Sequence, residues 1–99
     1  MQSIEHVTFR LAPGTDRAAF LENARRTEGA VRRQPGFVAR MLTERDDGTW
    51  SDIVTWTSHD HAMAAASDIL SDPDFAPFGA MIHGPSVQMT HSALVWRLD

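Results

Sequence analysis

Large apolar side chains occupy both alternating sets of positions in the segments predicted to be strands, and this feature constrains the fold most. A strand points successive side chains to opposite faces, so a sheet covered on one side alone should alternate apolar and polar residues. The positions that depart from this rule are Phe37 and Met41 against Val38 and Leu42, Val54 and Trp56 against Ile53, and Val87 and Met89 against Leu94 and Trp96. The pattern therefore predicts that both faces of the sheet are buried.

Periodicity and turn residues predict where the strands lie. Asp46, Asp47 and Gly48 separate two alternating segments, and Asp-Gly between such segments indicates a β-hairpin. Proline and glycine close the other alternating segments. The predicted strands cover residues 4–11, 37–45, 49–57 and 86–98.

Two helices are predicted between these strands. The first covers about residues 16–34, follows a Thr15 cap and ends at Pro35, because the residue before a proline is driven out of the helical region. Ser58 is predicted to cap the second, and Asp72 with Pro73 begins a further helical turn. The buried sides are predicted to be Phe20, Ala24, Thr27 and Val31 in the first helix and Ala62, Ala66, Ile69 and Leu70 in the second.

The βαββαβ order predicts a ferredoxin-like α+β fold in one domain, residues 1–99. Two right-handed crossovers around a central hairpin give a four-stranded antiparallel sheet with both helices on one face. Nothing is left in 99 residues to cover the second face. We therefore expect a homodimer whose two sheets pack face to face.

Composition excludes several classes of chemistry and partner. The chain has no cysteine, which excludes disulfides, cysteinate metal sites and a thiol nucleophile. All nine basic residues are arginines, so no lysine can form a Schiff base. A net charge of -4 makes nucleic acid an unexpected partner. No apolar segment is long enough to span a membrane and no signal peptide is recognised, so a cytoplasmic protein is expected.

Three segments carry a resemblance to a known family. They are Asp46-Asp47-Gly48-Thr49-Trp50, Ile53-Val54-Thr55-Trp56-Thr57-Ser58 and Ser71-Asp72-Pro73-Asp74-Phe75. With the predicted architecture, they make the chain resemble the dimeric α+β barrel superfamily and, within it, the antibiotic-biosynthesis monooxygenase-like group. The resemblance implies a dimeric α+β barrel with a ligand cavity between the sheet and the helices of each subunit.

Trp56 and Asp52 are the first candidate site residues. They share a strand face because their offset of four preserves parity. The cofactor-independent quinone-forming branch of the group has a matching Trp, with an amide at the position of Asp52. The resemblance implies that Trp56 forms a wall for an aromatic substrate and that Asp52 accepts a proton from a phenol or enol. The alternative is that Trp56 is a core residue and Asp52 pairs with an arginine or caps a turn.

The remaining candidates are His83, Phe9 and Phe78. His83 ends the proline-interrupted segment expected at the cavity mouth, where an imidazole could be a general base; the alternative is an exposed loop histidine. Phe9 and Phe78 are predicted to contact substrate. Arg40 lies on a strand, where a guanidinium needs a partner or an anionic ligand.

Histidine spacing does not predict a metal site. His59 and His61 do not share a helix face, and parity leaves the faces of His6 and His91 undetermined. The heme-degrading branch has an Asn near the position of Phe9 and an iron-binding His at the position of Gly79, so both positions depart from that pattern.

The sequence thus predicts a homodimeric, cofactor-independent monooxygenase-like protein that binds a small aromatic or polyketide-type ligand. In that chemistry a deprotonated phenolic substrate reacts directly with oxygen, and the protein supplies desolvation and orientation. The alternatives are a non-catalytic dimeric small-molecule-binding protein of unknown function and a heme-handling enzyme. For the leading function we expect no cofactor, no metal, no nucleic acid and no membrane partner.

Overall fold

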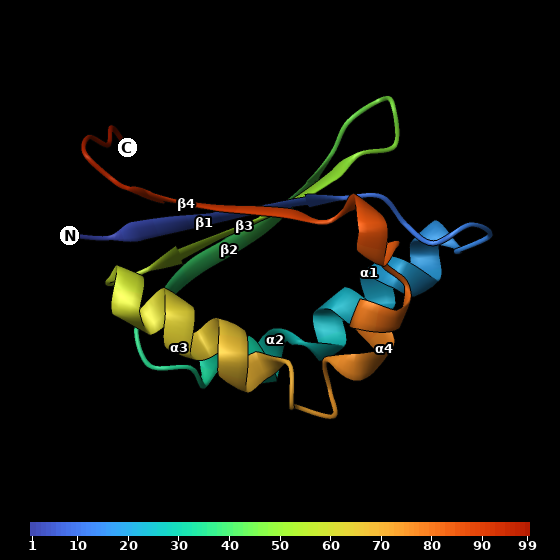
Figure 1. The fold of residues 1–99 in the computed structure, drawn as a ribbon, viewed down its shortest axis with the longest axis horizontal. Helices are drawn as coiled ribbons and strands as arrows, with labels where there is room; N and C mark the ends of the chain where they lie inside the picture. Colours follow the sequence, from blue (N-terminus) through green and yellow to red (C-terminus); the bar gives the residue numbers. More distant parts are fainter.

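Four antiparallel strands form one sheet in the order β2-β3-β1-β4 in the computed structural model, which describes residues 1–99. The helices lie on one face of this sheet and leave the other face bare (Figure 1). This arrangement confirms the expected ferredoxin-like α+β fold. The strands are β1 (Ser3–Phe9), β2 (Phe37–Glu44), β3 (Trp50–Trp56) and β4 (Gln88–Ala93).

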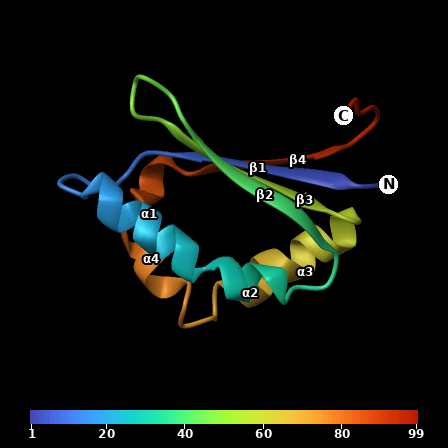
Figure 2. The same ribbon diagram turned by 180° about the vertical axis from the view of Figure 1, so that it is seen from behind.

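The helices under the sheet are short. They are α1 (Arg17–Arg26), α2 (Glu28–Arg32), α3 (His59–Ile69) and α4 (Ala76–Ala80), followed by the 3-10 turn η1 (Gly84–Ser86). Figure 2 shows the same layer from behind, with α1 and α2 running under β2. None of these helices has the length and apolar character that a bilayer crossing requires.

The expected first helix is interrupted at Thr27, so the prediction of one helix over residues 16–34 was wrong. The Thr27 hydroxyl donates to the Ala24 carbonyl oxygen at 2.6 Å, and such local bonds compete with regular helix geometry. The cap was also displaced by one residue. Asp16, not Thr15, accepts from the backbone N–H of Ala19 at 3.0 Å.

The hairpin and the cap of α3 confirm their predictions. Gly48 adopts a φ of +86°, and the Arg45 N–H donates across the turn to the Thr49 carbonyl oxygen at 2.8 Å. The Ser58 hydroxyl accepts from the His61 N–H at 3.2 Å. The predicted burial of Leu70 was wrong, because α3 ends there and the side chain points into solvent.

The core between sheet and helices consists of two apolar clusters. One contains Val31, Val54, Trp56, Ala62, Ala65 and Ile69, and the other contains Phe9, Phe20, Ala24, Trp50 and Phe78. In the second cluster, the Phe20 ring stacks on Phe78 at 5.1 Å and meets Trp50 edge-on at 4.9 Å between ring centroids. Most of the large aromatic side chains therefore fill this layer.

The outer face of the sheet is less apolar than the alternation predicted. A register shift between Phe37 and Ala39 lets Phe37 and Leu42 both pack toward the helices, while Met41 points outward and is 59% exposed. Because β4 ends at Ala93, the apolar residues after it lie on no sheet face. The outward apolar positions are Ile4, Ala39, Met41 and Ile53, with serine and threonine beside them.

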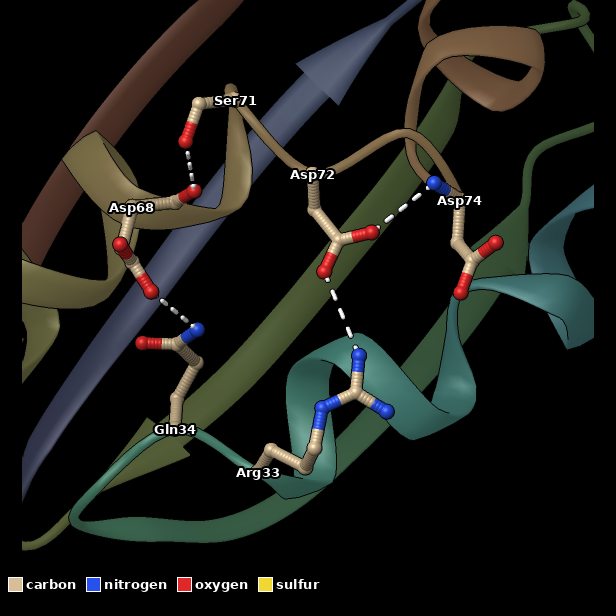
Figure 3. A network of polar contacts seen from close by, with 6 residues as sticks. All are labelled: Arg33, Gln34, Asp68, Ser71, Asp72 and Asp74. Carbon is tan, nitrogen blue, oxygen red and sulfur yellow. Dashed lines mark hydrogen bonds and ion pairs between the residues drawn. The ribbon is translucent and has the colours of Figure 1, made fainter.

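A polar network ties the end of α2 to the end of α3 (Figure 3). Arg33 Nη2 lies 3.3 Å from Asp72 Oδ2, and Gln34 Nε2 donates to Asp68 Oδ2 at 2.8 Å. Asp72 also accepts from the Asp74 N–H at 2.9 Å, as expected of a carboxylate before a proline turn. The α4 helix itself begins only at Ala76.

Gly36 is predicted to be the glycine that tolerates substitution least. Its φ is +85°, and a Cβ there would approach His61 Cγ at 2.5 Å and Thr57 Oγ1 at 2.7 Å. We expect Gly36→Ala to lower the free energy of unfolding by about 3 kcal/mol in urea titrations, from backbone strain plus overlap. Gly14 has a φ of +79° with nothing within 4 Å, so Gly14→Ala isolates the backbone cost of about 1 kcal/mol. Equal losses in the two variants would contradict the steric argument.

Candidate functional site

A half-buried ion pair lies on the helix-facing side of the sheet. Arg40 of β2 donates from Nε to Asp52 Oδ1 at 2.9 Å and from Nη2 to Asp52 Oδ2 at 2.8 Å. Each side chain is only 13% exposed. The two parallel bonds fix the plane of the guanidinium. The structure therefore gives Asp52 the arginine partner that was one of its two interpretations.

Strand register and the helix break bring this pair together. Arg40 lies opposite Val54 and Leu42 lies opposite Asp52, so the two charged side chains are diagonal neighbours on one face. Arg40 Nη1 also donates to Thr27 Oγ1, at the break between α1 and α2, at 2.7 Å. The hydroxyl that interrupts the helix thus holds the guanidinium.

Arg40 lines an open groove of about 500 Å³ between β2 and the helices α1 and α2, which we call the Arg40 groove. Its walls are mainly apolar. A guanidinium has five N–H donors, and three of them bond Asp52 and Thr27, so two remain for a ligand. The lining residues are Leu21, Ala24, Arg25, Glu28, Val31, Arg32 and residues 37–42.

The other residues predicted for the site lie elsewhere. Trp56, Phe9 and Phe78 are each 1% exposed, belong to the core clusters and do not line the Arg40 groove. Phe78 does lie close behind it, with its ring centroid 5.4 Å from Arg40 Cζ. His83 is exposed, lines neither of the two main grooves, and donates from its backbone N–H to the Arg10 carbonyl oxygen at 2.8 Å.

Sequence reasoning missed a second polar cluster, which we call the Glu5 cluster: Glu5, His91 and His59. Glu5 Oε2 lies 3.3 Å from His91 Nε2, and the His59 and His91 rings meet edge-on at 5.2 Å between centroids. Glu5 shares strand parity with Val7 and Phe9, so the alternation alone predicts that its side chain points toward the helices. The partner could not be read, because pairing of β1 with β4 joins residues far apart in the chain.

Burial raises the pKa of Glu5 above its usual 4.5, because the charged form loses hydration. The hydrogen bond and charge of His91 act in the opposite direction, and the indole of Trp56 also lowers this pKa. The nearby carboxylate of Asp52 raises it further. Glu5 is thus a buried acid whose proton is held more tightly than in water.

Comparison with known proteins identifies the fold. No known family profile matches the sequence, and no curated protein matches it. Among solved structures, SnoaB from Streptomyces nogalater, a cofactor-independent oxygenase, is 25% identical over 99% of this chain and 95% of its own, with a TM-score of 0.65. A SnoaB variant gives a TM-score of 0.73 at 24% identity, over 98% of this chain and 96% of its own.

A candidate antibiotic biosynthesis monooxygenase from Bordetella bronchiseptica is 19% identical, over 96% of this chain and 98% of its own, with a TM-score of 0.75. The chain has the antibiotic-biosynthesis monooxygenase-like fold. This result confirms the resemblance drawn from the sequence. In this chain, the antibiotic-biosynthesis monooxygenase-like fold positions Arg40 and Asp52 on its helix-facing side.

The raised pKa of Glu5 predicts a pH dependence of stability. The folded protein binds the Glu5 proton more tightly than the unfolded chain does, so the resulting stabilisation is complete below pH 4.5 and is lost as pH rises through the raised pKa. We expect the stability of the wild type relative to Glu5→Gln to fall over that range in urea titrations at a series of pH values. Glu5 faces His91, with His59 and Asp52 nearby, and all three are kept in both proteins.

Asp47 supplies the matched control, because hydrogen bonds from Thr49 lower its pKa below 3.8. The stability of the wild type relative to Asp47→Asn should therefore change in the opposite direction, falling only as pH drops below 3.8. A difference between wild type and Glu5→Gln that stays flat as pH rises above 4.5 would contradict the assignment of Glu5 as a tightly held acid.

Proposed function

We propose that the protein is a homodimeric, cofactor-independent monooxygenase-like protein that binds a small aromatic or polyketide-type ligand in the Arg40 groove. The observation that carries the proposal is a partly satisfied guanidinium at an apolar groove. Apolar walls suit a ring system, and the two remaining N–H donors suit a phenolate or enolate oxygen. The SnoaB structure, a cofactor-independent oxygenase on the same fold, supports this choice over other reactions.

The proposed chemistry requires that the ligand be ionised in a partly desolvated environment. A guanidinium close to the ligand oxygen favours the ionised ligand, and the electron-rich anion reacts directly with oxygen. For an anthrone, the ring CH2 becomes C=O, one oxygen atom enters the product, and the other leaves as water. The substrate supplies all four electrons, so the balance requires no further reductant.

Asp52 holds the guanidinium in this proposal. Its two bonds to Arg40 fix the donor direction, which is a positioning role. Removing a proton from the ligand through Asp52 would require one of those bonds to break. The catalytic roles predicted for Asp52 and His83, and the substrate contacts of Trp56, Phe9 and Phe78, stay predictions.

The second subunit is proposed from the bare face of the sheet. Ile4, Met41 and Ile53 point away from the helices, and the tail after β4 carries the exposed side chains of Val95, Trp96 and Leu98. Together they form apolar surface that a second copy of the chain can cover by packing sheet against sheet.

One alternative function has a specific observation in its favour. The aromatic side chains expected to touch substrate, Trp56, Phe9 and Phe78, are fully packed in the core. A non-catalytic dimeric small-molecule-binding protein would need only the Arg40 groove. The heme-handling alternative lacks such support, because no histidine lines the Arg40 groove.

Oxygen uptake with anthrones and hydroquinones tests the proposed function. We expect the double variant Arg40→Met with Asp52→Leu to bind the phenolate at least tenfold more weakly, because the anion loses the one largely buried cation of the groove, and the exposed Arg25 and Arg32 are screened by water. The double variant is used because Arg40→Met alone leaves the Asp52 carboxylate without its partner. Asp52→Asn should keep binding and lower kcat about tenfold, because the guanidinium is held less firmly.

Arg97→Met is the control, since Arg97 pairs only with Asp99 in the exposed tail. Ligand binding without oxygen uptake in the wild type would select the binding-protein alternative. Equal binding by the wild type and the double variant would remove the Arg40 groove from either function.

Light scattering tests the dimer. We expect a particle of twice the 11.0 kDa chain mass at micromolar concentration. Met41→Glu with Ile53→Glu should dissociate it, because two carboxylates per subunit would be buried between the sheets. Met63→Glu, on exposed α3 surface, serves as the control. A folded wild-type particle of 11.0 kDa would refute the proposed dimer.

A further inference from the structure

The Glu5 cluster lies beside a second groove, separate from the one lined by Arg40. This groove has a volume of about 290 Å³ and lies where the beginning of β1 and the end of β4 meet the start of α3. We call it the His91 groove. Its lining residues are Met1, Gln2, Ser3, His59, His91, Ser92 and Ala93. The volume suits a small ligand rather than an extended ring system.

Two imidazoles form one side of this groove, and a carboxyl group lies behind one of them. His91 and Glu5 are directly opposite in the β1–β4 register, and their side chains are 16% and 10% exposed. Glu5 does not line the groove, so it reaches a bound ligand only through His91. From the interior outward, the Glu5 carboxyl comes first, the His91 imidazole second and the groove last.

This order determines which ring nitrogen is available. An ionised Glu5 can only accept a hydrogen bond, so in the neutral imidazole Nε2 carries the proton and Nδ1 keeps its lone pair. A proton taken up at Nδ1 produces an imidazolium, which the carboxylate at 3.3 Å stabilises. The arrangement is that of a base oriented and supported by a second group.

The groove lining also favours a neutral ligand with an acidic hydroxyl. It contains no arginine, aspartate or glutamate side chain, whereas the hydroxyl of Ser3 and the amide of Gln2 can each donate or accept. His59 adds an aromatic face, with its ring at 87° to that of His91. No group of three His, Asp or Glu side chains is arranged to hold a metal ion.

We propose that the His91 groove is a second binding site, in which the Glu5–His91 pair removes a proton from a small phenol or enol. In that step the O–H bond of the ligand breaks and a bond from the proton to His91 Nδ1 forms. The ligand anion stays beside the imidazolium, whose other N–H remains bonded to Glu5. His91 is the base and Glu5 is a positioning residue. The site does not depend on the oxygenase function proposed above.

The buried character of Glu5 supports this assignment. Burial raises the pKa of Glu5 above 4.5 and so brings its affinity for a proton closer to that of an imidazole. The pair can then hold and release one proton between them. Trp56 closes the inner side of the cluster, because its side chain is 1% exposed and its indole is close enough to Glu5 to lower the pKa of that carboxyl. The accessible route for a proton therefore leads through His91 to the groove.

The experiment uses 4-nitrophenol, whose anion absorbs visible light and whose neutral form does not. The double variant Arg40→Met with Asp52→Leu is used, because its Arg40 groove binds a phenolate at least tenfold more weakly. At a pH below the pKa of the free phenol, adding this protein should increase the anion absorption until one equivalent per chain is bound. Calorimetry measures total binding in the same solutions. We expect His91→Gln in the same double-variant background to lose at least nine-tenths of the anion signal, because the base is removed.

Glu5→Gln separates the positioning role from a structural one. It should keep phenol binding within about twofold by calorimetry and lose roughly tenfold in the anion-to-neutral ratio, equivalent to one pKa unit. His83→Gln is the matched control, because His83 is an exposed imidazole outside both main grooves. Circular dichroism melting confirms that each variant is folded.

The double variant Arg40→Met with Asp52→Leu distinguishes the two grooves. In this double variant the His91 groove should still supply one equivalent of 4-nitrophenol anion signal, whereas phenolate binding to the Arg40 groove is weakened at least tenfold. An anion signal that survives His91→Gln in the double-variant background, or that is absent from the double variant while His91 is intact, would overturn the proposal. Neither result would decide whether the Arg40 groove supports oxygen uptake.

Discussion

The contact of Arg40 with Asp52 and Thr27 is the interaction on which the rest of the site depends. A guanidinium on the covered face of a sheet loses most of its hydration and is tolerated only when its N–H groups are bonded. Asp52 takes two of those bonds and the Thr27 hydroxyl takes a third. The same hydroxyl interrupts the helix, so one side chain sets both the direction of α2 and the position of the charge that faces the Arg40 groove.

The covered face carries a second polar pair, Glu5 and His91, in the row of the sheet that contains Arg40. Across the strands the row reads Arg40, Val54, Glu5 and His91, so a valine separates the two pairs. Each pair lies beside its own groove. An apolar core would need neither pair for stability, since replacing a buried ion pair by apolar residues is often neutral.

Local signals predicted the architecture well because they act over a few residues. The Asp-Gly turn, the Ser58 cap and the inward parity of Phe9 and Trp56 all depend on neighbours in the sequence. The prediction failed where distant residues decide the outcome. Strict alternation along β2 assigned wrong faces beyond Val38, because the register shifts there. The first helix was predicted to continue through Thr27, where the structure has a break.

The candidate site was predictable only in part, for the same reason. That Asp52 and Trp56 share a face follows from their spacing, and the need of a strand arginine for a partner was recognised from its chemistry. To predict the bond between Arg40 and Asp52, the register of the hairpin must be known. To predict that Glu5 lies close to His91, the pairing of the first and last strands must be known. Neither can be read from a single sequence without knowing which strands are adjacent.

The short helix α2 is fastened at both of its ends. Thr27, just before it, is bonded to Arg40, and Arg33 and Gln34, just after it, are bonded to Asp72 and Asp68. This helix forms one wall of the Arg40 groove, so the wall is set during folding rather than on ligand arrival. A stiff wall spares the ligand the entropic cost of ordering it and makes selection depend on shape. For the ligand proposed for this groove, one added ring substituent should therefore lower the affinity, because α2 is held at both of its ends.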